Sequence, residues 1–503
     1  MAKYKPYTYA QDMLIPVSLK EQLMPGTLEF AIHTLVDERM DVSIFDEKYR
    51  NDDTGRRAYD PRILLKVVLL GYSRGLISSR KIEQACKENV VFMALSCGQY
   101  PDHSTIAPFV ASMKEKILPL FRDVLLVCEE MNLLGGTFFA LDGCRLPGNA
   151  SMRWSGKVDD LRRKKEKIEE RVRQTLNEQE EEDRKDDEPP YSGGNREKQV
   201  EALKKQADRI QGWLNENEAK IGKKGREIRS NVTDNDSATM ITSHGMIQGY
   251  NSQALVDAKH RVIIHGEVFG EGHDEALIPP MIDGAKENMS QIGQADSAEY
   301  FAGKTLTADS GYHSKSNIQK CEEEKLDAYI PDKQMSTRDP RYDEWRRKGR
   351  MTRTHYALED YLHNEEEDHY VCPNGKILKL SEKCHRSTGN IYRLYRAQEK
   401  DCRDCRLKSK CIYGNGRGPK NLTVPIGPDG INLSQIMVEK IESEKGRKIY
   451  SHRIAIVEQV FGNIRANKRM DRFTLRGKIK VNIQWLLYCM VHNIEKIATY
   501  GFA

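Results

Sequence analysis

Three acidic side chains stand where carboxylates could act together on one ligand. Asp142 ends the run TFFALD and Asp309 ends the run KTLTAD, and a glycine follows each within two residues. Both runs predict short strands, and an acid at the end of a strand lies at the sheet edge, within reach of a ligand. Asp-Gly sequences are also common in turns, so neither acid decides the matter alone. The third acid, Glu458, lies in the segment from Tyr450 to Lys468.

This segment predicts a helix with one broad apolar face. At about 100° per residue, Glu458 and Arg465 lie side by side on the border of that face. The apolar arc contains Ile454, Ile456, Val457, Val460, Phe461 and Ile464. A surface Glu–Arg pair is the ordinary interpretation of this spacing. From Lys445 to Lys480, however, eleven basic residues accompany only two acids, and one acid in a cationic region is typical of a metal ligand beside a polyanion.

The same helix resembles a known signature. Tyr450, Arg453, Glu458 and Arg465 are similar to the Tyr-x2-Arg-x3-Glu-x6-Lys pattern of DDE transposases of bacterial insertion sequences. Two departures are that four residues separate Arg453 from Glu458, and that Arg465 stands in place of Lys. The runs LDG, TDNDS, GYNSQ and TADSGY resemble this family at matching places, as do YDPRILLKVVLLGYSRGLISSRKIEQACKEN and PDHSTIAPF near the start, although Val110 replaces an Arg.

The resemblance implies an RNase H-like α/β core and two-metal chemistry on DNA. Asp142 and Asp309 would lie on adjacent strands and be the main ligands of Mg²⁺ or Mn²⁺, with Glu458 completing the second ion's shell. Two such ions can activate a water or a 3′-hydroxyl and stabilise the leaving oxygen in a phosphodiester displacement. Phosphate-gripping residues would be Tyr450, Arg453, Arg465 and Lys468.

Five segments are expected, giving an α/β fold with a mixed sheet, an all-α front and two insertions. Residues 1–135 read as an N-terminal helical domain, and 136–156 with 230–335 as the RNase H-like core. Residues 157–229 predict a coiled-coil-like helical hairpin, a spacer unless it contacts a second copy or DNA. Residues 336–440 form an insertion with cysteines, and 441–503 are helices that complete the core.

The helical front end leaves two interpretations open. Short helices with exposed Arg74, Arg80, Lys81 and Lys87 are compatible with a helix-turn-helix-like DNA-binding module or with a bundle carrying ordinary solvated charges. The resemblance favours binding of the element's terminal repeats.

Four further acids compete with the three chosen ones. Asp234 and Asp236 predict caps or turns of the backbone, and Asp274 is expected in the first turn of a helix from about 274 to 286. Asp257 is also ranked below Asp142 and Asp309.

Four cysteines in the second insertion have zinc-like spacing. Cys372 is followed about thirty residues later by Cys402-x2-Cys405-x5-Cys411, which suits a structural tetrahedral Zn²⁺ site. Free thiols in a reducing cell are the alternative, as is a site in which Cys384 replaces Cys372.

The amino-acid composition limits the cellular compartment and the partners to be expected. The 503 residues include 80 Lys and Arg against 75 Asp and Glu, so a nucleic-acid surface must be local. No apolar run of membrane-spanning length or signal-peptide core is visible, and eleven cysteines fit a reducing compartment, so we expect a cytoplasmic, nucleoid-associated protein. The expected partners are double-stranded DNA and a second copy of the chain. A nuclease that does not join strands and a transposase-derived DNA-binding regulator are the alternative functions.

Overall fold

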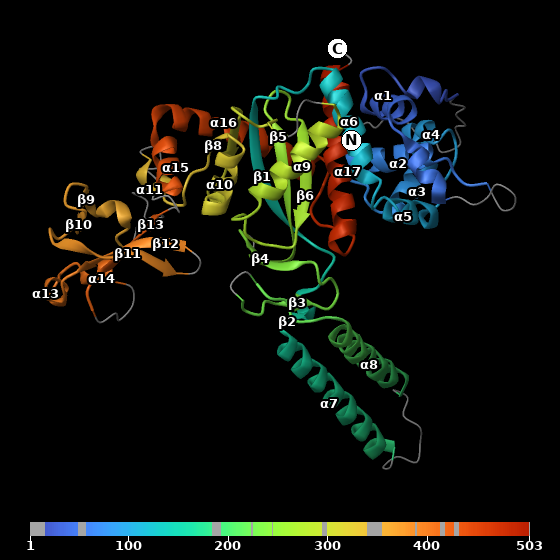
Figure 1. Cartoon of the computed structure of the whole chain (residues 1–503). Coiled ribbons are helices and arrows are strands. Elements are labelled where there is room, and N and C mark those ends of the chain that lie inside the picture. Colours follow the sequence, from blue (N-terminus) through green and yellow to red (C-terminus); the bar gives the residue numbers. More distant parts are fainter. Residues whose placement is uncertain are drawn as a thin grey trace, which may run out of the picture. The chain divides into compact units, whose positions relative to one another are not determined.

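The protein is described here from a computed structural model with a mixed α/β fold (Figure 1). The structure describes residues 16–48, 57–183, 193–222, 225–243, 245–293, 299–339, 355–387, 390–412, 418–426 and 432–501. The chain forms two compact units: Met1–Asp274 with Pro279–Leu306 and Arg453–Ala503, and Glu275–Ile278 with Thr307–His452. This division differs from the five expected segments, and each unit is treated by itself. No helix in the described ranges is long and apolar enough to cross a membrane.

Short helices build the N-terminal part of the first unit. They are α1 Leu28–Thr34, α2 Pro61–Ser73, α3 Ser79–Glu88, α4 Val90–Leu95, α5 His103–Ala111 and α6 Ile117–Glu130, with the π-helix η2 Leu35–Arg39 and two 3₁₀ segments, η1 Lys20–Gln22 and η3 Val42–Lys48. Asp60 caps α2, whose first residue is Pro61. Helices α3 and α4 are separate because Asn89 is extended and caps α4. Asp102 caps α5.

Antiparallel strands paired on β5 form the centre of the first unit. Strand β5 Gly245–Asp257 pairs along one edge with β1 Phe138–Pro147, and along the other with β4 Ala238–Thr242 and β6 Ile263–Phe269. Strands β5 and β6 therefore form an antiparallel hairpin around Lys259. The full sheet order is β4-β5-β1-β7-β8, where β7 is Thr305–Ala308 and β8 is Asp327–Tyr329. The boundary between the units falls within β7.

Asp142 lies in the middle of β1, which corrects the expectation that it ends a strand. The ladder continues from Asp142 opposite Ala254 to Pro147 opposite Gly249, because β5 is long enough to pair beyond the acid. The small residue at position 143 did not stop the strand.

Helix α17 Lys478–Lys496 is mostly buried within this unit. Its Trp485 and Cys489 pack so closely on Gly266 of β6 that a Cβ there would lie 2.9 Å from the Cys489 sulphur. On another side it contacts the N-terminal helices, where the rings of Tyr488 and Tyr72 are 5.1 Å apart. Helix α9 Ile278–Gln291 starts four residues after Asp274, which shows that Asp274 precedes the helix rather than occupying its first turn.

Asp234 and Asp236 hold the start of α17, in agreement with their predicted capping role. The Asp236 carboxylate accepts the Lys478 N–H at 2.8 Å, and Asp234 accepts the Gly477 N–H at 3.2 Å. Asp234 also accepts the Tyr250 hydroxyl at 2.8 Å, which ties the cap to β5. Asp257 likewise binds backbone, accepting the N–H groups of Gly135 and Gly136.

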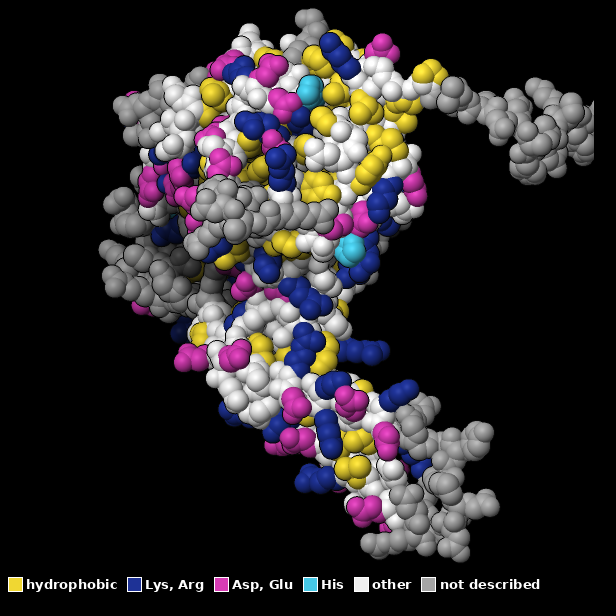
Figure 2. All heavy atoms as spheres, turned by 90° about the vertical axis from the view of Figure 1, so that its right-hand side faces the viewer, with side chains coloured by type: hydrophobic (Ala, Val, Ile, Leu, Met, Phe, Trp, Pro, Cys, Tyr) yellow, Lys and Arg dark blue, Asp and Glu magenta, His cyan; other side chains and the backbone are white. Residues whose placement is uncertain are grey.

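Helices α7 Val158–Asp183 and α8 Gly193–Glu216 pack against each other as the expected hairpin. The two-stranded pair β2 Ser155–Gly156 and β3 Ser230–Asn231 closes its base, next to a cluster of Leu161, Ile210 and Trp213. On the face that Figure 2 shows, basic and acidic side chains are interspersed along these helices. The expected turn at 184–192 lies outside the described residues.

The second unit contains a five-stranded antiparallel sheet, ordered β13-β12-β11-β10-β9. The strands are β9 Leu362–Asn364, β10 His369–Val371, β11 Ile377–Ser387, β12 Asn390–Ala397 and β13 Asn421–Ile426. Its helices are α10 Lys315–Glu323, α11 Met335–Arg338, α13 Glu399–Arg403, α14 Lys408–Cys411 and α15 Leu433–Glu442, and α16 Glu444–Gly462 continues into the first unit. The basic stretch 341–353 lies outside the described residues.

Candidate active site

Asp142 and Arg453, 311 positions apart in the chain, form the central contact of the candidate site. The guanidinium of Arg453 donates to Asp142 Oδ2 at 2.7 Å, and the Gly143 N–H donates to Oδ1 at 2.8 Å. The Asp142 side chain is 21% exposed and that of Arg453 13%. A charge-assisted bond in such a partly buried place is stronger than an exposed ion pair. The predicted acid on the strand and the predicted basic residue on the helix are thus brought together.

Glu458 lies on the same helix, five positions after Arg453, with an exposed side chain. The buried face of α16 consists of Ile456, Val457, Val460 and Phe461. Ile454, expected in the apolar arc, is 51% exposed, which corrects that assignment. The buried face is narrower than the sequence indicated because only one side of α16 packs on the unit's core.

A chain of contacts fixes α16 relative to β1. Phe461 stacks on Trp485 of α17 with ring centroids 6.2 Å apart, and the Trp485 indole N–H donates to the Gln253 carbonyl at 2.9 Å. Gln253 lies opposite Gly143 on the β1–β5 ladder. A Cβ at Gly143 would stand 2.1 Å from Gln253 Nε2, so this position requires glycine. The residue after Asp142 therefore lets the Gln253 amide reach across the strand.

Polar groups that the sequence argument missed surround this point. Asp274 Oδ1 accepts from Asn251 Nδ2 at 2.6 Å and from Gln253 Nε2 at 3.0 Å, while Arg145 approaches Asp274 Oδ2 at 3.5 Å. Asn251 and Gln253 are almost completely buried, which is costly unless their amides are hydrogen-bonded. The signal was present in GYNSQ, where polar side chains occupy a strand that otherwise reads as core.

Arg465 belongs to the π-helix η8 Asn463–Asn467 and is exposed. Its charge acts on β1: burial raises the pKa of the Cys144 thiol to about 12, Arg465 opposes this rise, and Asp142 adds to it. A cation and the candidate acid therefore influence the same thiol, two residues from Asp142.

Lys468 does not face solvent, in contrast to its expected role at phosphates. Its side chain is fully buried and its ammonium pairs with Glu495 Oε2 at 2.5 Å. Burial lowers the pKa of Lys468, and the Glu495 carboxylate opposes that shift. The resemblance implied that this lysine binds phosphate, whereas the fold buries it beside Glu495. We leave Lys468 out of the proposed DNA contacts.

Asp309 belongs to the second unit and directly follows β7. It caps the 3₁₀ turn η5 Ser310–Tyr312 by accepting the Gly311 N–H at 2.8 Å. His313 directly follows this turn. Its two ring nitrogens are hydrogen-bonded to the Ile330 carbonyl at 2.9 Å and to the Ser434 hydroxyl at 2.6 Å. The loop carrying Asp309 is therefore well anchored within its unit.

Tyr450 is half-buried on α16, three residues before Arg453.

Two carboxylates of the first unit are hard oxygen donors of the kind that divalent cations prefer. Asp142 is paired with Arg453, and Glu458 offers an exposed carboxylate on the same helix as Arg453. Within the described part of the chain, no three His, Cys, Asp or Glu side chains are already arranged to hold a metal ion.

Comparison with known families identifies the class of protein. A model described as "Transposase DDE domain" matches residues 371–498, which include Arg453, Glu458 and Arg465. A model described as "Transposase domain (DUF772)" matches residues 17–112, the N-terminal helices. Comparison with curated proteins gave no match. The chain is a DDE transposase of the insertion-sequence type.

Proposed function

We propose that this transposase cleaves phosphodiester bonds at the ends of an insertion sequence and joins the freed 3′-hydroxyl ends to target DNA. The observation that carries the proposal is the Arg453–Asp142 contact, because it joins the helix that bears Glu458 to the strand that bears the first acid. Asp142, Asp309 and Glu458 are the proposed metal-ligating acids. Mg²⁺ or Mn²⁺ bound there would activate the attacking oxygen and stabilise the leaving one.

The chain's own residues supply positioning and charge. Arg453 keeps the Asp142 carboxylate oriented and neutralised until a cation arrives, and Asp142 keeps Arg453 extended for a phosphate. Arg465 and Tyr450 are the further proposed phosphate contacts. The N-terminal helices, with Arg74, Arg80 and Lys81 exposed, are the proposed surface for the terminal repeats. Two DNA ends must be held together, so the proposed working form is a dimer or larger.

The test is a cleavage and strand-transfer assay with purified protein, Mg²⁺ and DNA that carries the element's ends. The parent should cut and join, whereas Asp142→Ala, Asp309→Ala and Glu458→Ala should lose about a hundred- to a thousandfold in rate, since removal of one charge-stabilising group costs about that much. All three should still bind the end DNA in a mobility-shift experiment. Glu444→Gln, on an exposed acid at the start of the same helix, is the matched control and should keep the parental rate.

Each result separates the candidate functions. Cutting without joining would assign a nuclease of the same fold, and binding without cutting would assign a DNA-binding regulator. Parental cutting by either aspartate variant would show that the metal ligands lie elsewhere.

A further inference from the structure

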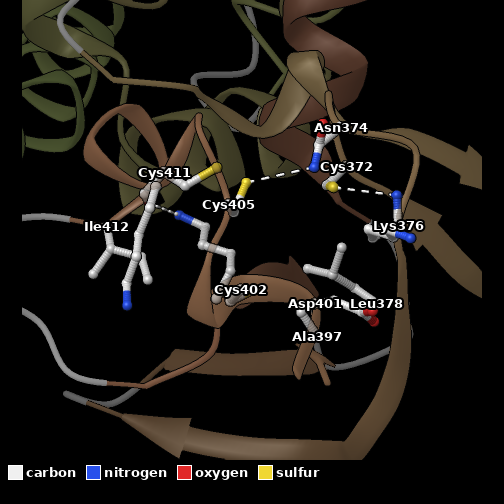
Figure 3. A pocket seen from close by; sticks show the side chains of 12 residues that line it. Cys372, Asn374, Lys376, Leu378, Ala397, Asp401, Cys402, Cys405, Cys411 and Ile412 are labelled. Atoms are coloured by element: carbon white, nitrogen blue, oxygen red, sulfur yellow. Dashed lines mark hydrogen bonds between the residues drawn. The ribbon is translucent and has the colours of Figure 1, made fainter. Parts of the chain in front are cut away.

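The second unit contains a group of thiols that the proposed chemistry on DNA does not use. Of the ten cysteines whose side chains are described, none is in a disulfide, and four lie within forty residues: Cys372, Cys402, Cys405 and Cys411. These four line one small cavity (Figure 3). They come from the turn after β10, from α13 and the turn that follows it, and from the end of α14.

The Cys372, Cys405 and Cys411 sulphurs point toward a common region. Figure 3 shows the Cys405 and Cys411 sulphurs next to each other, with the Cys372 sulphur facing them across the cavity. Cys402 lines the same cavity.

Hydrogen-bond donors surround these sulphurs. The Lys376 N–H donates to Cys372 Sγ at 3.3 Å, within the tight turn that starts Cys-Pro-Asn-Gly. The Asn374 side-chain amide donates to Cys405 Sγ at 3.6 Å, and the Tyr361 hydroxyl is 3.5 Å from Cys411 Sγ. Such donors stabilise thiolates, which are the form that binds metal.

The charges of the cavity wall suit a metal bound by four thiolates. Lys376, Lys408 and Lys420 line it against one acid, Asp401. Zn²⁺ with four thiolates carries two net negative charges, which nearby ammonium groups offset.

The small sheet beside the cavity also needs support. Among its described residues, the buried core consists of Tyr361, Tyr370, Leu378, Tyr395, Ala397 and Leu422, with Cys372 and Cys402 packed against it. A module of this size with so few buried side chains is commonly stabilised by a metal or by disulfides. Because the described cysteines form no disulfide, a metal is the remaining means of stabilising this module.

We propose that Cys372, Cys402, Cys405 and Cys411 bind one structural Zn²⁺ that fastens α13 and α14 to the turn after β10. Since no three described side chains already stand in a coordinating arrangement, binding requires the thiols to turn inward toward one centre. Four protein ligands leave no position open for a substrate, so the metal stabilises the fold rather than taking part in catalysis. The Cys384 side chain lies outside those described and is not part of the proposal.

The test measures the metal content of the purified full-length protein by mass spectrometry after growth in zinc-supplemented medium. The parent should carry about one zinc per chain. The zinc content of the double variant Cys402→Ser/Cys405→Ser should be at least about tenfold lower. Cys97→Ser, on an exposed cysteine of the first unit, is the control and should keep its zinc. A parent without zinc, a parent that holds iron instead, or a double variant with full zinc content would overturn the proposal.

A second measurement covers the case in which the double variant does not fold. The parent is stripped of metal and titrated with Co²⁺, which should produce the absorption bands of tetrahedral thiolate coordination and saturate at about one ion per chain. Cobalt spectra without thiolate charge-transfer bands would equally overturn the proposal. Neither measurement involves DNA, so the result is independent of the proposed function.

Discussion

Arg453 is the residue on which the candidate site depends most directly, because it neutralises Asp142 from the helix that carries Glu458. Arg453→Met removes the charge and keeps much of the apolar stem, so we expect the cleavage rate to fall roughly 10- to 100-fold, the equivalent of one lost charged hydrogen bond. Arg453→Lys should lose less, since an ammonium restores charge without the planar fork.

The measurement is the single-turnover rate of cleavage of end-containing DNA at saturating Mg²⁺. Arg39→Met is the matched control, because it breaks an exposed ion pair with Glu130 on the N-terminal helices. Equal losses in the Arg453 and Arg39 variants would mean that the Asp142 contact has no special role.

Gly143 is a second position where one residue decides the geometry. In Gly143→Ala the new methyl would meet Gln253 Nε2, which Asn251 and Asp274 hold in place. We expect the free energy of unfolding to fall by about 1–3 kcal/mol, as for other overpacked sites. Gly148→Ala, where the nearest atom is 3.5 Å away, should change it by less than about 1 kcal/mol. Urea denaturation measures both, and identical values would contradict the argument.

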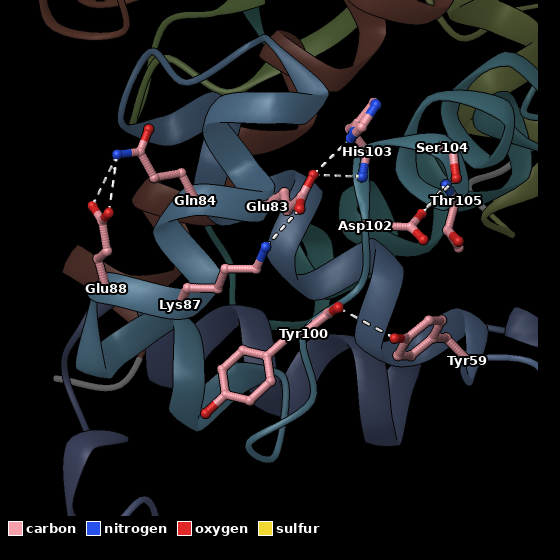
Figure 4. Close-up of polar contacts among 10 residues, drawn as sticks. All are labelled: Tyr59, Glu83, Gln84, Lys87, Glu88, Tyr100, Asp102, His103, Ser104 and Thr105. Carbon is pink, nitrogen blue, oxygen red and sulfur yellow. Dashed lines mark hydrogen bonds and ion pairs between the residues drawn. The ribbon is translucent and has the colours of Figure 1, made fainter.

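At the scale of elements, Glu83 joins α3 to the start of α5 (Figure 4). Its carboxylate accepts from Lys87 Nζ at 2.6 Å, and from the His103 N–H and ring Nδ1 at 3.0 and 2.7 Å. These bonds lower the pKa of Glu83 to about 2 from its usual 4.5, and the bond from Lys87 has the largest effect. Because the folded pKa is the lower one, the stabilisation is complete above pH 4.5 and is lost as pH falls toward 2.

Glu83→Gln should therefore lower the melting temperature at pH 7, and the difference from the parent should shrink between pH 4.5 and 2. Glu88→Gln is the control on the same helix, where the acid accepts a hydrogen bond from the Gln84 side-chain amide. Thermal melts followed by circular dichroism across this pH range give the comparison. A difference that stays constant with pH would refute the assigned cause.

At the scale of the whole molecule, the helical arm should be separable from the fold of the first unit. The β2–β3 pair and the cluster of Leu161, Ile210 and Trp213 close its base, and the two helices pack mainly on each other. Replacing residues 169–202 by a short Gly/Ser linker retains that base. We expect the melting temperature of the remainder to change by only a few degrees, since loop length affects stability weakly.

Differential scanning calorimetry of the shortened chain checks the arm's structural role, and the strand-transfer assay then reveals its functional one. Unchanged joining would make the arm a spacer. Unfolding of the first unit on removal of 169–202 would show that the arm contributes to the core.

The sequence by itself determined the local elements. Helical spacing located α7, α8 and α16, and Asp234 and Asp236 were recognised as caps or turns. These features depend on side chains a few positions apart, which is the range that periodicity and capping rules describe. The family followed from the same helix, because Arg453, Glu458 and Arg465 keep a recognisable spacing.

Tertiary packing decided everything that depends on distant partners. It extended β1 beyond Asp142 by pairing it with β5, paired Asp142 with Arg453, and gathered Asn251, Gln253 and Asp274 beside Gly143. It also buried Lys468 against Glu495, directly after the π-helical turn η8. Contacts between residues hundreds of positions apart leave no period in the sequence, so only the folded chain could reveal them.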